Sequence, residues 1–122
     1  MGDQHKPILV IEDNDDVRQG LRVLLQLEGY TVFTASDGEE ALATLRGGLD
    51  PCLLILDLTM PSMNGYDFRR QQLQDDRLAR IPTIVCSGDG RIADKAHELG
   101  AVGFYKKPIE IDEFLHLVSA HC

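Results

Sequence analysis

The stretch LLILDLTMPSMNG, at residues 53–65, opens with four aliphatic residues, reaches a carboxylate at Asp57 and continues into a Met-Pro turn. A short apolar run bounded by turn residues is typical of a strand that is buried on both faces of a parallel sheet. A carboxylate at the end of such a strand is either solvated at the edge of the sheet or held there for chemistry. The residues that end the other strands decide between these two interpretations.

Segments with strand character alternate along the chain with segments of helical periodicity. We expect strands at residues 8–11, 30–35, 52–57, 81–87 and 101–106, and helices at 14–28, 36–45, 66–74, 91–99 and around 111–118. Ser36 and Glu39 have the spacing of a capping box at the start of the second helix. This alternation predicts an α/β fold, a doubly wound five-stranded parallel sheet of order 2-1-3-4-5 with five helices, as in flavodoxin-like proteins.

The length and composition are those of one globular domain. The 122 residues, 43% hydrophobic and 26% charged, are enough for one core, so we expect a single domain over residues 1–122 with an ordered core at about 7–121. No apolar run is long enough to span a bilayer, and residues 1–7 lack the apolar segment of a secretory signal. We therefore expect a cytoplasmic protein without membrane insertion.

Net charge and cysteine content exclude several classes of function. The formal net charge of −8 argues against direct binding of nucleic acid or anionic membranes, since both need a basic face. The three cysteines, Cys52, Cys86 and Cys122, are widely spaced and odd in number, so they indicate neither a metal site nor a disulfide framework. We expect reduced, buried thiols.

Polar residues end the strands that should lie in the middle of the sheet. The first strand ends in Glu12 and Asp13, the third in Asp57, the fourth in Ser87, and the fifth is followed by Lys107. In a doubly wound sheet, ligands bind beyond the carboxyl ends of the strands. Three carboxylates that converge there repel one another, and a hard divalent cation such as Mg²⁺ relieves that repulsion.

This set of groups suits phosphoryl transfer. Asp57 would be the nucleophile, the metal ion would neutralise developing charge, and Lys107 would pair with a phosphate oxygen. A phosphotransferase of the haloacid dehalogenase type is an alternative, but it needs a second aspartate at the position of Thr59. A flavodoxin is another, but its phosphate loop would be repelled by the acidic segment EDNDD at residues 12–16.

Over nearly its whole length the chain resembles the receiver domain of two-component response regulators, including the chemotaxis regulators. The resemblance is carried by ILVIEDNDDVRQGLRVLL (8–25), LLILDLTMPSMNGYDF (53–68), IPTIVCSG (81–88) and GAVGFYKKPI (100–109). It implies that Asp57 is the phosphoacceptor. It also implies that Asp13, Asp57 and the carbonyl of Thr59 bind Mg²⁺, with Mn²⁺ as a substitute, while Glu12 acts through a water molecule.

The resemblance further implies a conformational switch. Lys107 matches the lysine of the family, with a cis bond to Pro108, while Ser87 and Phe104 match its switch hydroxyl and switch aromatic. Phe104 also has a plainer interpretation as a core aromatic. The implied donor is a phosphohistidine on a sensor histidine kinase or a histidine phosphotransfer protein, and the implied output is a protein partner or a covalently linked module. The segment from Ser87 to Lys107 is about two residues shorter than the family pattern.

Overall fold

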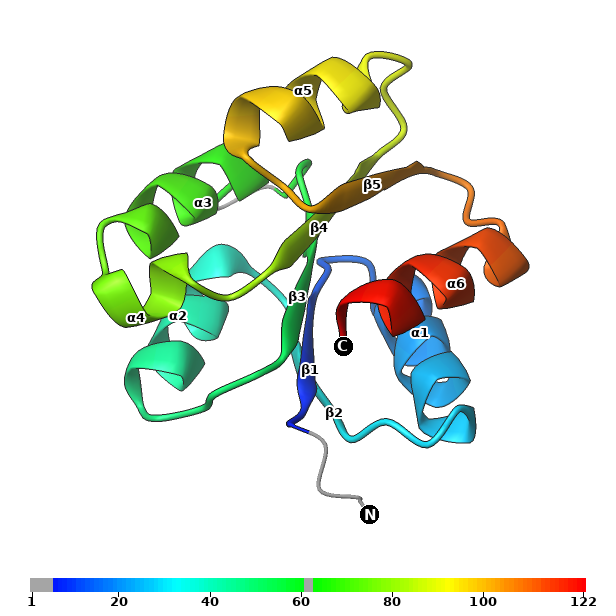
Figure 1. The fold of residues 1–122 in the computed structure, drawn as a ribbon, viewed down its shortest axis with the longest axis horizontal. Coiled ribbons are helices and arrows are strands. Elements are labelled where there is room, and N and C mark those ends of the chain that lie inside the picture. Colours follow the sequence, from blue (N-terminus) through cyan, green and yellow to red (C-terminus); the bar gives the residue numbers. More distant parts are fainter. Residues whose placement is uncertain (1–5, 61–62) are drawn as a thin grey trace.

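The computed structural model describes residues 6–60 and 63–122, and its centre is one parallel sheet (Figure 1). The strands lie in the order β2-β1-β3-β4-β5, as predicted. Their bounds are Ile8–Ile11 (β1), Val32–Ala35 (β2), Leu53–Asp57 (β3), Thr83–Ser87 (β4) and Gly103–Lys106 (β5). Because β1 and β4 flank β3, the residues that follow these three strands meet at one edge of the sheet.

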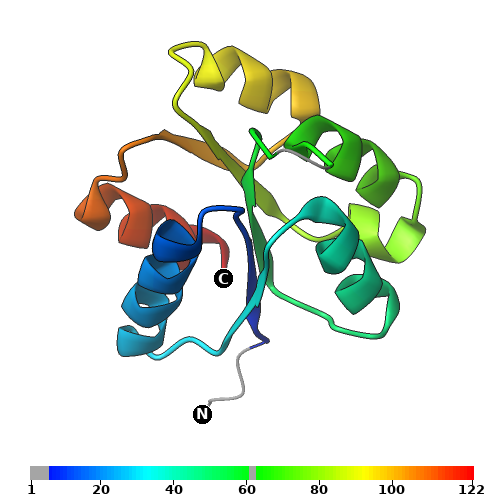
Figure 2. The same ribbon diagram turned by 180° about the vertical axis from the view of Figure 1, so that it is seen from behind.

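Helices cover both faces of the sheet, as Figures 1 and 2 show from opposite sides. α1 (Asp15–Leu27) and α6 (Ile111–His121) pack on one face, and α2 (Gly38–Arg46), α3 (Gly65–Leu73), α4 (Asp76–Ala79) and α5 (Ile92–Leu99) pack on the other. None of the helices in the described ranges is long and apolar enough to cross a membrane.

Two local predictions about the helices are wrong. The described residues form six helices rather than five, because the Asp75 side chain accepts hydrogen bonds from the backbone N–H groups of Arg77 and Leu78 and so starts the short helix α4. The capping box of α2 is shifted by one residue. Asp37 is the N-cap, and the carboxylate that reaches back to the N–H of Ser36 belongs to Glu40.

Burial explains why the central strands are so apolar. Every residue of β1, β3 and β4 is buried, which confirms that these strands are covered on both faces. Side chains that point to alternate faces enter two separate cores, one under α1 and α6 and one under the four remaining helices. The sheet is therefore a rigid base for whatever follows β3, and Asp57 is its last residue.

The expectation of three reduced cysteines is wrong. Cys52 and Cys122 form a disulfide with a Cα–Cα distance of 5.4 Å, across a sequence separation of 70 residues. The pairing follows from the fold, because the residue before β3 lies beside the end of α6. Only Cys86 is free, and burial raises the pKa of its thiol to about 12.

A buried arginine ties α3 to the end of α5. Arg69 is 5% exposed, and its Nε donates to the carbonyl of Leu99 at 3.0 Å and its Nη2 to that of Gly100 at 3.2 Å. Its Nη1 donates to Oε1 of Gln72 at 2.8 Å and to Oγ1 of Thr83 at 3.3 Å. Burial lowers the pKa of this guanidinium, and the hydrogen bonds to neutral oxygens hold it in place.

Gly65→Ala should destabilise the fold by about 1–3 kcal/mol, because overpacking displaces the backbone. A Cβ at Gly65 would lie 2.6 Å from Cα of Leu58 and 2.8 Å from the carbonyl oxygen of Asp57. Urea denaturation measures the loss. The matched control is Gly20→Ala in α1, where a Cβ meets nothing within 4 Å, and the gain should be up to about 1 kcal/mol. Equal effects of the two substitutions would contradict the expected clash.

Candidate functional site: an acidic cavity at the carboxyl edge of the sheet

A cavity of about 640 Å³ lies at the carboxyl edge of the sheet. We call it the acidic cavity. Its walls come from the loops after β1, β3 and β4, the segment after β5, and the helices α1 and α5. The lining residues are Glu12, Asp13, Asn14, Val17, Asp57, Thr59, Ser87, Gly88, Asp89, Lys95 and Lys107. The fold thus brings together the three carboxylates, the hydroxyl and the lysine that end or follow the central strands.

Asp57 and Glu12 share one cation. The ammonium of Lys107 lies 3.0 Å from Oε1 of Glu12 and 3.4 Å from Oδ2 of Asp57. Both carboxylates are almost fully buried, at 1% exposure each. The peptide bond between Lys107 and Pro108 is cis, as the resemblance implied. One positive charge therefore faces two buried negative charges, and the cavity has an excess of negative charge.

The electrostatics of Asp57 follow from this excess. Burial raises the pKa of Asp57 to about 7, and the neighbouring charge of Glu12 adds to the rise. The N–H of Thr59 donates to Oδ1 of Asp57 at 3.1 Å, and this bond, with the charge of Lys107, acts in the opposite direction. Asp57 is thus held in a fixed orientation but is poorly compensated as an anion.

Lys107 stays protonated. Burial alone would lower the pKa of Lys107, but the hydrogen bond to Glu12 and the charges of Asp57 and Glu12 outweigh burial and raise it. Glu12 is also oriented from the other side, since the N–H of Asn14 donates to its Oε2 at 3.1 Å. The ammonium is therefore a permanent positive charge beside Asp57.

The remaining predicted residues differ in exposure. Asp13 and Thr59 are exposed at the mouth of the cavity, whereas Ser87 is buried and its Oγ accepts a hydrogen bond from the N–H of Asp89 at 3.1 Å. A further ion pair lies at the cavity, between Asp89 and Lys95 at 2.5 Å.

This pair was not predicted from the sequence. The nearness of Asp89 to Ser87 was a usable signal, but Lys95 comes from α5 and is placed by the fold alone.

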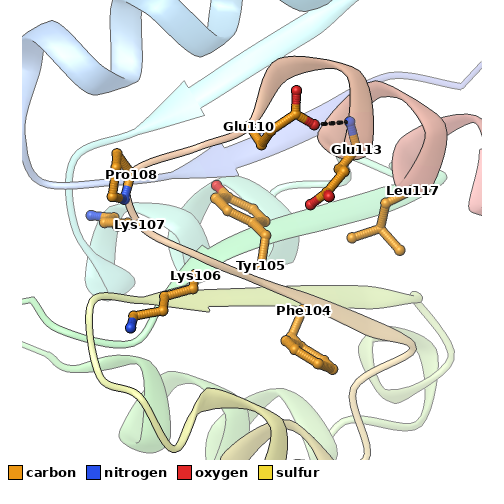
Figure 3. A pocket seen from close by; sticks show the side chains of 8 residues that line it. All are labelled: Phe104, Tyr105, Lys106, Lys107, Pro108, Glu110, Glu113 and Leu117. Atoms are coloured by element: carbon orange, nitrogen blue, oxygen red, sulfur yellow. Dashed lines mark hydrogen bonds between the residues drawn. The ribbon is translucent and has the colours of Figure 1, made fainter.

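Phe104 lies outside the acidic cavity, on the outward side of β5. Figure 3 shows Phe104 and Tyr105 on opposite sides of the strand, next to a surface pocket lined also by Glu113 and Leu117. Phe104 is 44% exposed, so its interpretation as a core aromatic is wrong. The core position belongs to Tyr105, whose ring meets that of Phe114 edge to face at 5.1 Å.

The comparison with known protein families shows which family this chain belongs to. Residues 8–119 match the family described as the response regulator receiver domain. The chain belongs to this family. The match spans all five strands and the whole acidic cavity, so the resemblance carried by the four motifs is confirmed.

Relatives and solved structures agree with the family. This receiver domain is 33% identical over 115 residues to the DNA-binding dual master transcriptional regulator RpaA of Synechocystis, a match that covers 93% of this chain and 47% of RpaA. It is similar to the chemotaxis protein CheY4 of Vibrio cholerae, with a TM-score of 0.87, 26% identity and coverage of 98% and 100%.

A response regulator receiver protein from Pseudomonas putida has a TM-score of 0.88 at 30% identity, with coverage of 98% of this chain and 99% of that one. The chain spans about half the length of the first curated relatives that it matches. This receiver domain is therefore a signalling domain of the two-component class with a chemotaxis-regulator-like fold.

Proposed function

We propose that Asp57 accepts a phosphoryl group from a phosphohistidine and that this switches the surface formed by α5, β5 and α6. One observation carries the proposal. Asp57 is fixed at the end of a buried strand, yet its carboxylate lines an open cavity beside a permanent ammonium group. Family membership makes the domain a phosphoacceptor, and the geometry supports Asp57 as the residue that is modified.

The proposed reaction uses the two oxygens of Asp57 differently. Oδ1 accepts the hydrogen bond from the N–H of Thr59, which orients the carboxylate, and Oδ2 faces Lys107. In the transfer, a carboxylate oxygen forms a bond to phosphorus while the bond between phosphorus and the histidine nitrogen breaks, and the product is an acyl phosphate. Lys107 pairs with the incoming negative charge. We propose that the domain catalyses only its own phosphorylation and a slow dephosphorylation.

The donor set fits Mg²⁺. The cavity offers the carboxylates of Glu12, Asp13 and Asp57 against the ammonium of Lys107, and such an excess of hard oxygen donors suits a divalent cation. We propose that Asp13, Asp57 and the carbonyl of Thr59 hold Mg²⁺, with Mn²⁺ as a substitute. Glu12 is engaged by Lys107, which supports its proposed contact through water. The bound ion would neutralise charge on the phosphoryl oxygens.

The proposed switch begins at Ser87. Its hydroxyl faces the cavity and now accepts a hydrogen bond from the N–H of Asp89, so it can exchange this partner for a phosphoryl oxygen. Phe104 lies on the adjacent strand and is exposed, and we propose that it turns inward when Ser87 changes its partner. A phosphoryl group brings charge and strong acceptor oxygens, which bias such a two-state element.

The surface beside the cavity is suited to binding a protein that donates the phosphoryl group. An apolar groove of about 650 Å³ runs along α1 to the start of α6, and Val17 lines both this groove and the acidic cavity. Exposed apolar patches of this kind mark protein-binding sites. We propose a sensor histidine kinase or histidine phosphotransfer protein as donor, and a protein partner or linked module as output. We also propose one cytoplasmic domain over residues 1–122, with its ordered core at about 7–121, without direct nucleic-acid contact.

Incubation with acetyl phosphate and Mg²⁺, followed by intact-mass measurement, tests the proposal. The wild-type chain should gain one phosphoryl group, and EDTA or Asp57→Asn should abolish the gain, because the first removes the cation and the second the nucleophile. Asp50→Asn, an exposed aspartate paired with Lys6, is the matched control and should be phosphorylated like the wild type. An adduct that persists in Asp57→Asn, or no adduct with any donor including a panel of kinases, would overturn the assignment.

A further inference from the structure

The disulfide between Cys52 and Cys122 joins two elements that both lead to the acidic cavity. Cys52 directly precedes β3, which ends at Asp57. Cys122 directly follows α6, which begins three residues after Pro108 and so four after Lys107. The cross-link therefore lies at the amino-terminal ends of the strands, on the side of the sheet away from the cavity. It joins the start of β3 to the end of α6.

Apart from this bond, α6 is attached to the sheet by a short row of apolar side chains. Of its eleven residues, Phe114 and Val118 are buried, and Leu115 and Leu117 pack against the same core while partly exposed. Both buried side chains point into the core under α1 and α6. The disulfide holds the helix beyond its last buried anchor at Val118.

The two linked cysteines are open to reagents in a way that the third is not. Cys52 and Cys122 are half-buried, whereas Cys86 is 1% exposed. Thiol–disulfide exchange needs access of an attacking thiolate to a sulfur atom. A disulfide that forms in a reducing compartment is usually redox-sensing rather than a permanent staple.

We propose that Cys52 and Cys122 are a reversible redox modification site that sets how firmly α6 is fixed to the sheet. The proposal rests on the proposed function as a cytoplasmic two-component domain. Oxidation of the two thiols releases two electrons and two protons, and a low-molecular-weight disulfide such as oxidised glutathione takes them up and becomes two thiols. The exchange passes through a mixed disulfide, which the second cysteine thiolate resolves.

Equilibration in glutathione buffers from strongly reducing to strongly oxidising tests the first half of the proposal. Samples are quenched in acid and alkylated in denaturant, and the number of labels on each chain is read from its intact mass. The oxidised chain should carry one label, on Cys86, and the reduced chain three. We expect half-conversion within the range of glutathione ratios found inside cells. A chain that stays oxidised throughout that range is permanently stapled, and one that never oxidises has no such site; either result overturns the proposal.

Hydrogen exchange of the α6 amides tests the second half. The amides at the end of α6 should exchange at least several-fold faster in the reduced chain than in the oxidised chain. The reason is that the cross-link no longer restrains local unfolding of this end of the helix. Cys122→Ser should exchange rapidly in both buffers. Ser119→Ala alters the same end of the helix but keeps both thiols, so it should retain the redox dependence. Equal exchange in the oxidised and reduced wild type would overturn the effect on α6.

The two proposals fail separately. Labelling and hydrogen exchange report on the cysteines and α6 without any phosphoryl donor, whereas the acetyl phosphate experiment reports on Asp57. Loss of the phosphoryl adduct with intact redox behaviour would overturn the function alone, and the reverse pattern would overturn the redox site alone.

Discussion

Asp57→Asn should raise the free energy of unfolding at pH 8, in magnesium-free buffer, by about 2–4 kcal/mol, with the gain vanishing near pH 4. The reason is the pKa of Asp57, which burial raises from 3.8 to about 7. The folded state binds the proton more tightly than the unfolded chain. The stabilisation that comes from this bound proton is therefore complete below pH 3.8 and is lost as the pH rises through about 7. Asparagine has no proton to lose.

Urea denaturation at several pH values with EDTA measures this effect. Asp50→Asn removes an exposed carboxylate that pairs with Lys6 at 3.0 Å, and it should change stability by less than about 0.5 kcal/mol at either pH. If Asp57→Asn gave the same gain at pH 4 as at pH 8, ionisation of Asp57 would not be the cause. Mg²⁺ should stabilise the wild type more than the variant, because binding to the folded state adds stability by mass action.

Arg69→Met should lower the free energy of unfolding by about 2–4 kcal/mol, because it takes the guanidinium donors away from two buried and two partly buried acceptors. The carbonyls of Leu99 and Gly100 at the end of α5 lose their side-chain partner, as does the amide oxygen of Gln72. Removal of a buried charge offsets part of this loss. Urea denaturation gives the size, and hydrogen exchange at the end of α5 shows its location.

The neighbouring residue provides the control for this substitution. Arg70 has the same side chain but lies on the exposed side of α3, where it pairs with Asp67 at 3.0 Å. Arg70→Met should cost less than about 0.5 kcal/mol, since exposed ion pairs contribute little. Similar losses in the two variants would show that Arg69 is not a structural link between α3 and α5.

The sheet and the location of the cavity could be predicted from the sequence because they depend on local patterns. Apolar runs at β1, β3 and β4 each end in a polar residue or lead directly to one, and the topology of a doubly wound sheet places these ends together. The cis bond at Pro108 also follows from a local motif. These features need no knowledge of distant contacts.

The features that were missed depend on contacts between distant segments or on single hydrogen bonds. Cys52 and Cys122 are 70 residues apart, and only the packing of α6 beside the start of β3 brings them together. Lys95 reaches the cavity from α5 through its ion pair with Asp89. The helix α4 has four residues, too few for a periodic pattern, and depends on the cap at Asp75.

The distribution of the cavity residues along the chain has a consequence for folding. The cavity is built from segments near residues 12, 57, 87 and 107, and the sheet that joins them pairs β1 with β3, β3 with β4 and β4 with β5. Contacts of such high sequence separation form slowly, because the entropy of closing long loops is lost before the contacts are made. An incompletely synthesised or partly unfolded chain therefore holds Asp57 without its lysine. Reactivity toward phosphoryl donors is then a property of the finished fold, and it reports on folding as well as on signalling.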